Sequence, residues 1–126
     1  MWKRLLLVVV AIVPLPAESA CTGADLQGRY VAMLAGELSG FWERCNVSVN
    51  ASGLATGSCL LSTGSVGPID PVQLSVSRNC FVSGNSARFS ISLRFQPHKR
   101  GLIGRFVLDN GINVFEGPVV MVKRGK

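Results

Sequence analysis

The sequence has a single histidine, His98, and only seven acidic residues among its 126. Nucleophilic catalysis by a serine needs a general base next to the hydroxyl, and histidine is the usual one. His98 lies in residues 96–101, a polar run with a proline and a glycine that is typical of an exposed turn. We therefore interpret His98 as a solvated turn residue and not as a catalytic base.

The motifs of other chemistries are also missing. The cysteines lack a Cys-x-x-Cys spacing for a metal, no stretch alternates acidic residues as a calcium loop does, and no glycine motif fits a phosphate. A pair of catalytic carboxylates would have to come from six acidic residues. Two of them, Glu37 and Glu43, flank a turn at residues 39–40, where acidic residues are ordinary. We predict a protein that is not an enzyme and binds no cofactor and no metal. The acidic residues after residue 20 are Asp25, Glu37, Glu43, Asp70, Asp109 and Glu116.

An uninterrupted apolar run covers residues 5–13, after two basic residues and before two prolines. This order is typical of a cleavable secretory signal, and the run is too short to span a bilayer. We predict a signal peptide at residues 1–20 and one domain at residues 21–126, exported to the periplasm or the extracellular space and not transmembrane after cleavage. In an alternative, Cys21 carries the lipid of a bacterial lipoprotein, but Glu18 stands where that signal has an aliphatic residue.

No segment of the predicted domain shows a helical period, and clusters of glycine, serine and asparagine recur every eight to twelve residues. This spacing is typical of consecutive short antiparallel strands. We predict an all-β fold, an antiparallel meander that forms a small sandwich or barrel of about eight strands. The longest predicted loop is residues 62–71. The predicted strands are residues 30–38, 41–49, 54–61, 72–77, 80–83, 88–95, 102–109 and 112–122.

The four cysteines all follow residue 20, and an even number in a short exported chain indicates two disulfides. In the predicted hairpin of residues 47–57, a three-residue loop that ends at Gly53 places Cys45 directly opposite Cys59. Such a pair is close enough for a disulfide. We therefore predict bonds between Cys45 and Cys59 and between Cys21 and Cys80.

The pattern Cys-x-Val-x-Val-Asn-x-x-Gly through Gly-x-Cys in residues 45–59 is followed by Cys-x-Val-x-Gly in residues 80–84. These stretches resemble parts of exported bacterial β-rich proteins of unassigned function. The resemblance implies an exported β-rich protein and assigns no functional residue.

Two further turns set the pairing of the last three predicted strands. A turn at Asn110 and Gly111 places Arg105 opposite Glu116, and a turn at residues 97–100 places Arg88 opposite Asp109. One face of this three-stranded meander is then apolar and faces the interior. The predicted inner residues are Phe89, Ile91, Leu93, Phe95, Leu102, Phe106, Leu108 and Phe115.

The outer face of the meander combines aliphatic and basic residues, and basic charge accumulates in this part of the chain. Residues 78–126 hold nine basic and two acidic residues, a net charge of +7, whereas residues 21–77 have a net charge of −2. Such a face suits a protein or an anionic component of the cell envelope. In the alternative, a second layer covers it. The predicted binding residues are Arg88, Arg94, Lys99, Arg100, Ile103, Arg105, Val107 and Val114.

Three functions fit these patterns to different degrees. The leading hypothesis is a non-enzymatic interaction or structural module that uses the outer face. The alternative is a small-ligand-binding β-barrel, in which the strands enclose a lined cavity, whereas four phenylalanines would fill a sandwich. A carboxylate hydrolase is the third and would need two acidic side chains in one cleft. Nucleic-acid binding is not predicted, because most aromatic residues of the basic half point inward.

Overall fold

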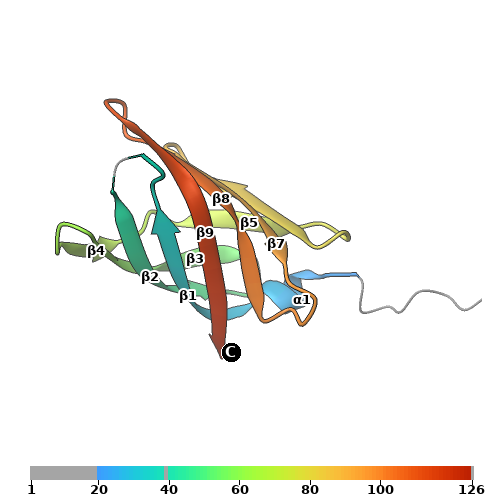
Figure 1. Cartoon of the computed structure of the whole chain (residues 1–126). Coiled ribbons are helices and arrows are strands. Elements are labelled where there is room, and N and C mark those ends of the chain that lie inside the picture. The colour runs from blue at the N-terminus through green and yellow to red at the C-terminus, as the bar shows by residue number, and fades with distance from the viewer. Residues whose placement is uncertain (1–19, 39, 126) are drawn as a thin grey trace, which may run out of the picture.

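The structure of the protein is a computed structural model that describes residues 20–38 and 40–125. Most of this part is antiparallel strand, which confirms the predicted all-β fold (Figure 1). None of its helices is long and apolar enough to cross a membrane. The predicted signal peptide lies outside the described residues except for Ala20. The elements are α1 (Gly23–Leu26), β1 (Gly28–Ala35), β2 (Trp42–Val49), β3 (Leu54–Leu61), β4 (Val66–Pro68), β5 (Val72–Val76), β6 (Phe81–Asn85), β7 (Phe89–Phe95), β8 (Gly101–Asp109) and β9 (Val114–Gly125).

The strands close into a barrel. They follow one another in chain order, and the circle closes because β9 pairs with β1 while β2 pairs with both β1 and β3. Eight strands form the closed barrel, and β4 is an extra strand beside β3. Closure removes the open edges that a sandwich keeps. Of the two predicted architectures, the barrel is therefore the one that forms.

The segment predicted as a loop, residues 62–71, contains strand β4, so this part of the prediction is wrong. Both β4 and β5 lie antiparallel to β3, β4 along its second half and β5 along two residues near its start. Their registers differ by one residue, and between them the Ile69 N–H donates to the Gly57 carbonyl at 2.9 Å. Pro68 and Pro71 have no amide hydrogen, which interrupts the strand here.

The hairpin of β2 and β3 has the predicted register. Cys45 lies opposite Cys59 and is bonded to it, with the two α-carbons 4.0 Å apart. Gly53 has a left-handed φ of +89° in the turn, and the Asn50 side chain accepts a hydrogen bond from the Leu54 N–H at 3.0 Å. The first predicted disulfide is therefore confirmed, together with the turn that brings the cysteines together.

The register of β7 and β8 is also as predicted. Ile91 lies opposite Phe106, and the Asp109 N–H donates to the Arg88 carbonyl at 2.8 Å. The Asp109 carboxylate, however, accepts a hydrogen bond from the Gly111 N–H at 2.9 Å. No ion pair joins Arg88 to Asp109 among the described residues.

The register of β8 and β9 differs from the prediction by two residues. Arg105 lies opposite Pro118, and Glu116 lies opposite Val107. Because side chains alternate along a strand, an even shift leaves the same residues inside. The predicted inner face is therefore formed, although the predicted pairing of Arg105 with Glu116 is wrong.

The turn between these strands explains the shift. Its loop residues are Gly111 and Ile112, one position later than predicted, and the Asn110 N–H donates to the Asn113 carbonyl at 3.1 Å. The Asn110 side chain also accepts a hydrogen bond from the Asn113 N–H at 2.7 Å. Gly111 has a φ of +88° at the first loop position, which favours glycine. Asn110 thus lies just before the loop and stabilises it through these hydrogen bonds.

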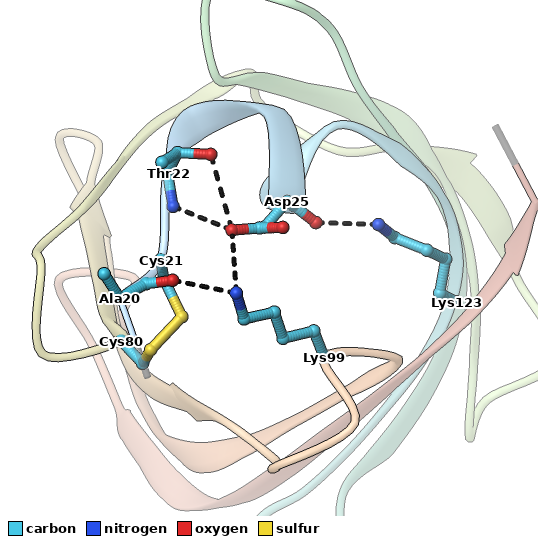
Figure 2. Close-up of polar contacts among 7 residues, drawn as sticks. All are labelled: Ala20, Cys21, Thr22, Asp25, Cys80, Lys99 and Lys123. Carbon is cyan, nitrogen blue, oxygen red and sulfur yellow. Dashed lines mark hydrogen bonds and ion pairs between the residues drawn. A yellow bond between two sulfur atoms is a disulfide. The ribbon is translucent and has the colours of Figure 1, made fainter. Parts of the chain in front are cut away.

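Helix α1 closes one end of the barrel. Figure 2 shows it inside the ring of strands, next to the disulfide of Cys21 and Cys80. Leu26 is 2% exposed, and the Tyr30 hydroxyl donates to the Leu26 carbonyl at 2.6 Å. The second predicted disulfide is therefore confirmed. Because the Cys21 sulfur is bonded to Cys80, it is not free to carry a lipid.

Polar contacts hold α1 in this place (Figure 2). The Asp25 carboxylate accepts a hydrogen bond from the Thr22 N–H at 2.9 Å and lies 3.4 Å from the Lys99 ammonium. Lys99 also donates to the Ala20 carbonyl at 2.8 Å, and Lys123 donates to the Asp25 carbonyl at 2.7 Å. Two lysines distant in the sequence therefore anchor the helix, Lys99 from the turn between β7 and β8 and Lys123 from β9.

Candidate ligand-binding cavity

A cavity of about 300 Å³ lies inside the barrel, and no residue of α1 is among its lining residues. Its lining includes Phe106 and Val119, each 1% exposed, and also Pro68 and Asp70, which are exposed. The cavity therefore runs from the core to the surface beside β4. Its lining residues are Ala32, Leu34, Phe41, Glu43, Cys45, Val47, Ala55, Cys59, Leu61, Gly67, Pro68, Ile69, Asp70, Val72, Leu74, Phe89, Ile91, Phe106, Leu108, Val119 and Met121.

Small side chains at inward positions leave this space. An eight-stranded barrel is just wide enough for large side chains to fill it, but Ala32 and Ala55, which are both buried, stand at two of its inward positions. Of the four phenylalanines predicted to fill the interior, Phe89 and Phe106 line the cavity. The other two do not line it. The lined cavity is the feature that distinguishes the small-ligand barrel from a filled sandwich.

Glu43 is an inward-facing acid on the cavity wall. It has the same orientation as Cys45 along β2, and it lies between Leu34 on β1 and Leu61 on β3. Its Oε1 atom lies 3.9 Å from the Cys45 sulfur, a contact and not a hydrogen bond, because a disulfide sulfur carries no hydrogen. The side chain is half-buried, and burial raises the pKa of Glu43 above its ordinary value of 4.5.

The charged residues of the lining are all acidic. They are Glu43 at half depth and Asp70 at the exposed end, and among the described lining residues there is no lysine, arginine or histidine. The ion pairs between described residues are those of Lys99 with Asp25 and of Arg105 with Glu37. Glu43 is therefore a partly desolvated carboxylate without an ionic partner in the described part of the chain.

The disulfide of Cys45 and Cys59 forms part of the wall beside Glu43. The carboxylate and the two sulfurs lie within 4.8 Å of one another. Because the sulfurs are bonded to each other, they supply no thiolate, which a metal site of this kind needs. The described lining also holds no nucleophile with an adjacent base. Nothing in this arrangement indicates a reaction.

The predicted outer surface lies on the opposite side of the same strands. Ile103, Val107 and Val114 are 47%, 38% and 58% exposed, so among the described residues no second layer covers them. The predicted face is continuous with apolar residues on neighbouring strands. One row of cross-strand neighbours runs over β1, β9, β8, β7 and β6, and we call it the outer row: Met33, Val120, Ile103, Arg94 and Phe81.

The basic residues predicted to edge this face have different surroundings. The Arg94 guanidinium lies 4.8 Å from the centre of the Phe81 ring, within the outer row. Arg105 forms two hydrogen bonds of 2.7 and 3.1 Å to Glu37 in the β1–β2 connection. Arg88 and Arg100 are exposed. Lys99 instead contacts α1 at the end of the barrel.

His98 lies in an exposed turn, as predicted. Its Nδ1 atom accepts a hydrogen bond from the Arg100 N–H at 2.9 Å within the same turn. No described lining residue of the cavity is a histidine. The structure thus gives this residue a local role in the turn.

Glu43 is a residue of the candidate site that the sequence alone does not single out, because an acid beside the turn at residues 39–40 is ordinary. The signal was present in the strand pattern, since the alternation that places Cys45 and Val47 inside also places Glu43 inside. An acid at an inward position of a predicted strand is a candidate functional residue, since burying its charge costs free energy.

Comparison of the chain with protein-family models, with curated proteins and with solved structures finds no match.

Proposed function

We propose that the protein binds a small, mainly apolar molecule in the cavity of the barrel. The observation that carries this proposal is the cavity of about 300 Å³ whose wall is apolar except for two carboxylates. Binding sites for small molecules are concave, mainly apolar and furnished with a few polar groups. The volume is at the lower end of the range for such sites, which favours a ligand with about ten non-hydrogen atoms.

The two disulfides are typical of an oxidising compartment, which supports a place of action outside the cytoplasm. We propose that the predicted signal at residues 1–20 directs this export, and that the ligand is bound in the periplasm or outside the cell.

The proposal is tested by titrating the oxidised protein with 1-octanol and measuring heat or dye displacement. About 0.8 kcal/mol for each buried CH2 group gives about 6 kcal/mol over eight carbons, which corresponds to a dissociation constant of tens of micromolar before the cost of association is subtracted. We expect saturable binding to one site per chain.

The matched variants change alanine to leucine at two positions each. Ala32→Leu with Ala55→Leu adds side-chain volume inside the cavity, whereas Ala35→Leu with Ala87→Leu makes the same change at exposed positions. We expect the first pair to weaken octanol binding at least about tenfold and the second pair to leave it unchanged. Absence of saturable binding to the folded wild-type protein contradicts the proposal.

A second candidate function uses the outer row. Its apolar members are between 42% and 50% exposed, and Arg94 lies among them. All its members except Met33 belong to residues 78–126, which have a net charge of +7. This arrangement supports the hypothesis of a module that binds an anionic surface of the cell envelope.

A further inference from the structure

We propose that the cavity selects apolar molecules that carry a protonated amine, and that the Glu43 carboxylate binds the ammonium group. This inference rests on the proposed function, because it assigns the class of ligand that the same cavity accepts. It follows from the sign of the charges on the wall, from the position of Glu43, and from the apolar character of the remaining lining.

The charges on the wall disfavour an acidic ligand. Glu43 and Asp70 are its charged residues, and no described lining residue is basic. A fatty acid would bring a third carboxylate into a partly desolvated space without a positive partner, which raises the free energy of the complex. A neutral or cationic ligand avoids this repulsion.

The position of Glu43 favours the cationic ligand over the neutral one. Its carboxylate is half-buried, lies against the disulfide at 3.9 Å, and has aliphatic neighbours on both adjacent strands, Leu34 and Leu61. Since no described basic residue pairs with it, an ammonium group that enters the cavity supplies the missing partner. Charge-assisted hydrogen bonds of this kind are about twice as strong as neutral ones.

The rest of the lining receives the apolar part of the ligand. Beyond Glu43, the wall continues toward the core through Ala32, Val47 and Phe106, which are all buried. An amine at Glu43 can therefore extend an alkyl chain or a small ring away from the surface into apolar surroundings. The ligand class that fits is a small primary amine with an apolar body.

The experiment measures the binding of 1-octylamine, 1-octanol and octanoate to the oxidised, folded protein at pH 7. The three probes have the same chain length. We expect octylamine to bind about tenfold more tightly than octanol, and octanoate to bind more weakly than both. The protein has a formal net charge of +6, which repels cations at long range. A preference for the amine therefore arises locally, in the cavity.

Two matched variants assign the preference to one residue. Glu43→Gln keeps the shape and removes the charge, so we expect it to bind octylamine and octanol equally. Asp109→Asn makes the same change at an exposed carboxylate that is not among the described lining residues, and we expect it to keep the preference for octylamine. Unchanged octanol binding in Glu43→Gln shows that its cavity is intact.

The outcomes separate this inference from the function on which it rests. If octanol binds and octylamine binds no more tightly than octanol, the proposed selectivity for amines is wrong, but the proposed apolar binding site is supported. A preference that survives in Glu43→Gln also overturns the inference, since another group then binds the ammonium. If none of the three probes binds, the proposed function itself fails.

Discussion

Glu43 shows how one inward residue can give a barrel a chemical preference. Alternation along β2 turns it toward the interior, where its neighbours are aliphatic and the adjacent disulfide offers no hydrogen for a hydrogen bond. This position lowers the free energy of unfolding, because an ionised carboxylate loses part of its hydration there. A residue that costs stability in the folded protein is a candidate for a functional role.

The pH dependence of stability measures this cost. Burial raises the pKa of Glu43 above 4.5, so the folded protein binds the proton more tightly than the unfolded chain does. The cost is therefore absent at pH values below the unfolded pKa, grows as the pH rises, and is complete above the folded pKa. We expect Glu43→Gln to raise the free energy of unfolding at pH 7 by less than about 1 kcal/mol, because water screens a half-exposed group, and to have no effect near pH 3.

The measurement is urea denaturation at both pH values, with Asp70→Asn as the control for the loss of one exposed carboxylate. Destabilisation of the protein by Glu43→Gln at pH 7 would contradict the interpretation of Glu43 as an unpaired acid.

Helix α1 is the element that closes one end of the barrel. It is only four residues long, so its own hydrogen bonds cannot maintain it. Leu26 in the core, the disulfide of Cys21 and the contacts of Asp25 with two lysines fix it in place. The cavity therefore opens at the other end, beside β4.

Removing the charge of Asp25 tests this anchoring. Burial raises the pKa of Asp25, but the hydrogen bond from Thr22 and the charge of Lys99 outweigh it and lower the pKa below 3.8. The carboxylate thus stabilises the fold above the unfolded pKa, and this contribution is lost as the pH falls through the lower folded pKa. We expect Asp25→Asn to reduce the free energy of unfolding at pH 7 by about 1–2 kcal/mol, and by less at pH 3.

Thermal or urea unfolding of both proteins provides the measurement. Asp109→Asn is the control, because Asp109 is exposed and its carboxylate bonds only within its own turn among the described contacts. Equal effects of the two substitutions would show that Asp25 does not anchor the helix through its charge.

The whole barrel presents two different surfaces, an apolar cavity with acidic groups inside and an apolar row with basic groups outside. Closure produces both, because alternate side chains of every strand point to opposite sides of one curved sheet. The outer row is exposed across five strands, as the predicted interaction surface requires. Its role in binding stays a prediction.

Charge reversal on the outer face tests that role. We expect the double variant Arg94→Glu, Arg100→Glu to lose at least about tenfold in association with vesicles that contain anionic phospholipid, since each basic residue near such a surface contributes about 1 kcal/mol. The control is Arg29→Glu with Arg78→Glu, the same change in net charge at exposed positions outside the predicted surface. Equal losses in both variants would indicate attraction by net charge alone, and the predicted face would then have no special role.

The amino-acid sequence by itself determined the local features of this protein: the antiparallel strands, the bond of Cys45 to Cys59, and which residues of β7 and β8 face inward. These depend on alternation and on short turns between strands that are neighbours in the chain. The Asn110–Gly111 signal predicts the turn one position too early, because the structure uses Asn110 and Asn113 to flank a loop of Gly111 and Ile112.

Only the tertiary structure decided between barrel and sandwich. That choice depends on the pairing of β1 with β9, the first and last strands of the barrel, and on the combined twist and tilt of all eight barrel strands. The cavity also depends on the tertiary structure. Its volume is the space that the inward side chains of several strands leave unfilled around Ala32 and Ala55. Glu43 became part of a site only when closure placed an apolar wall around it.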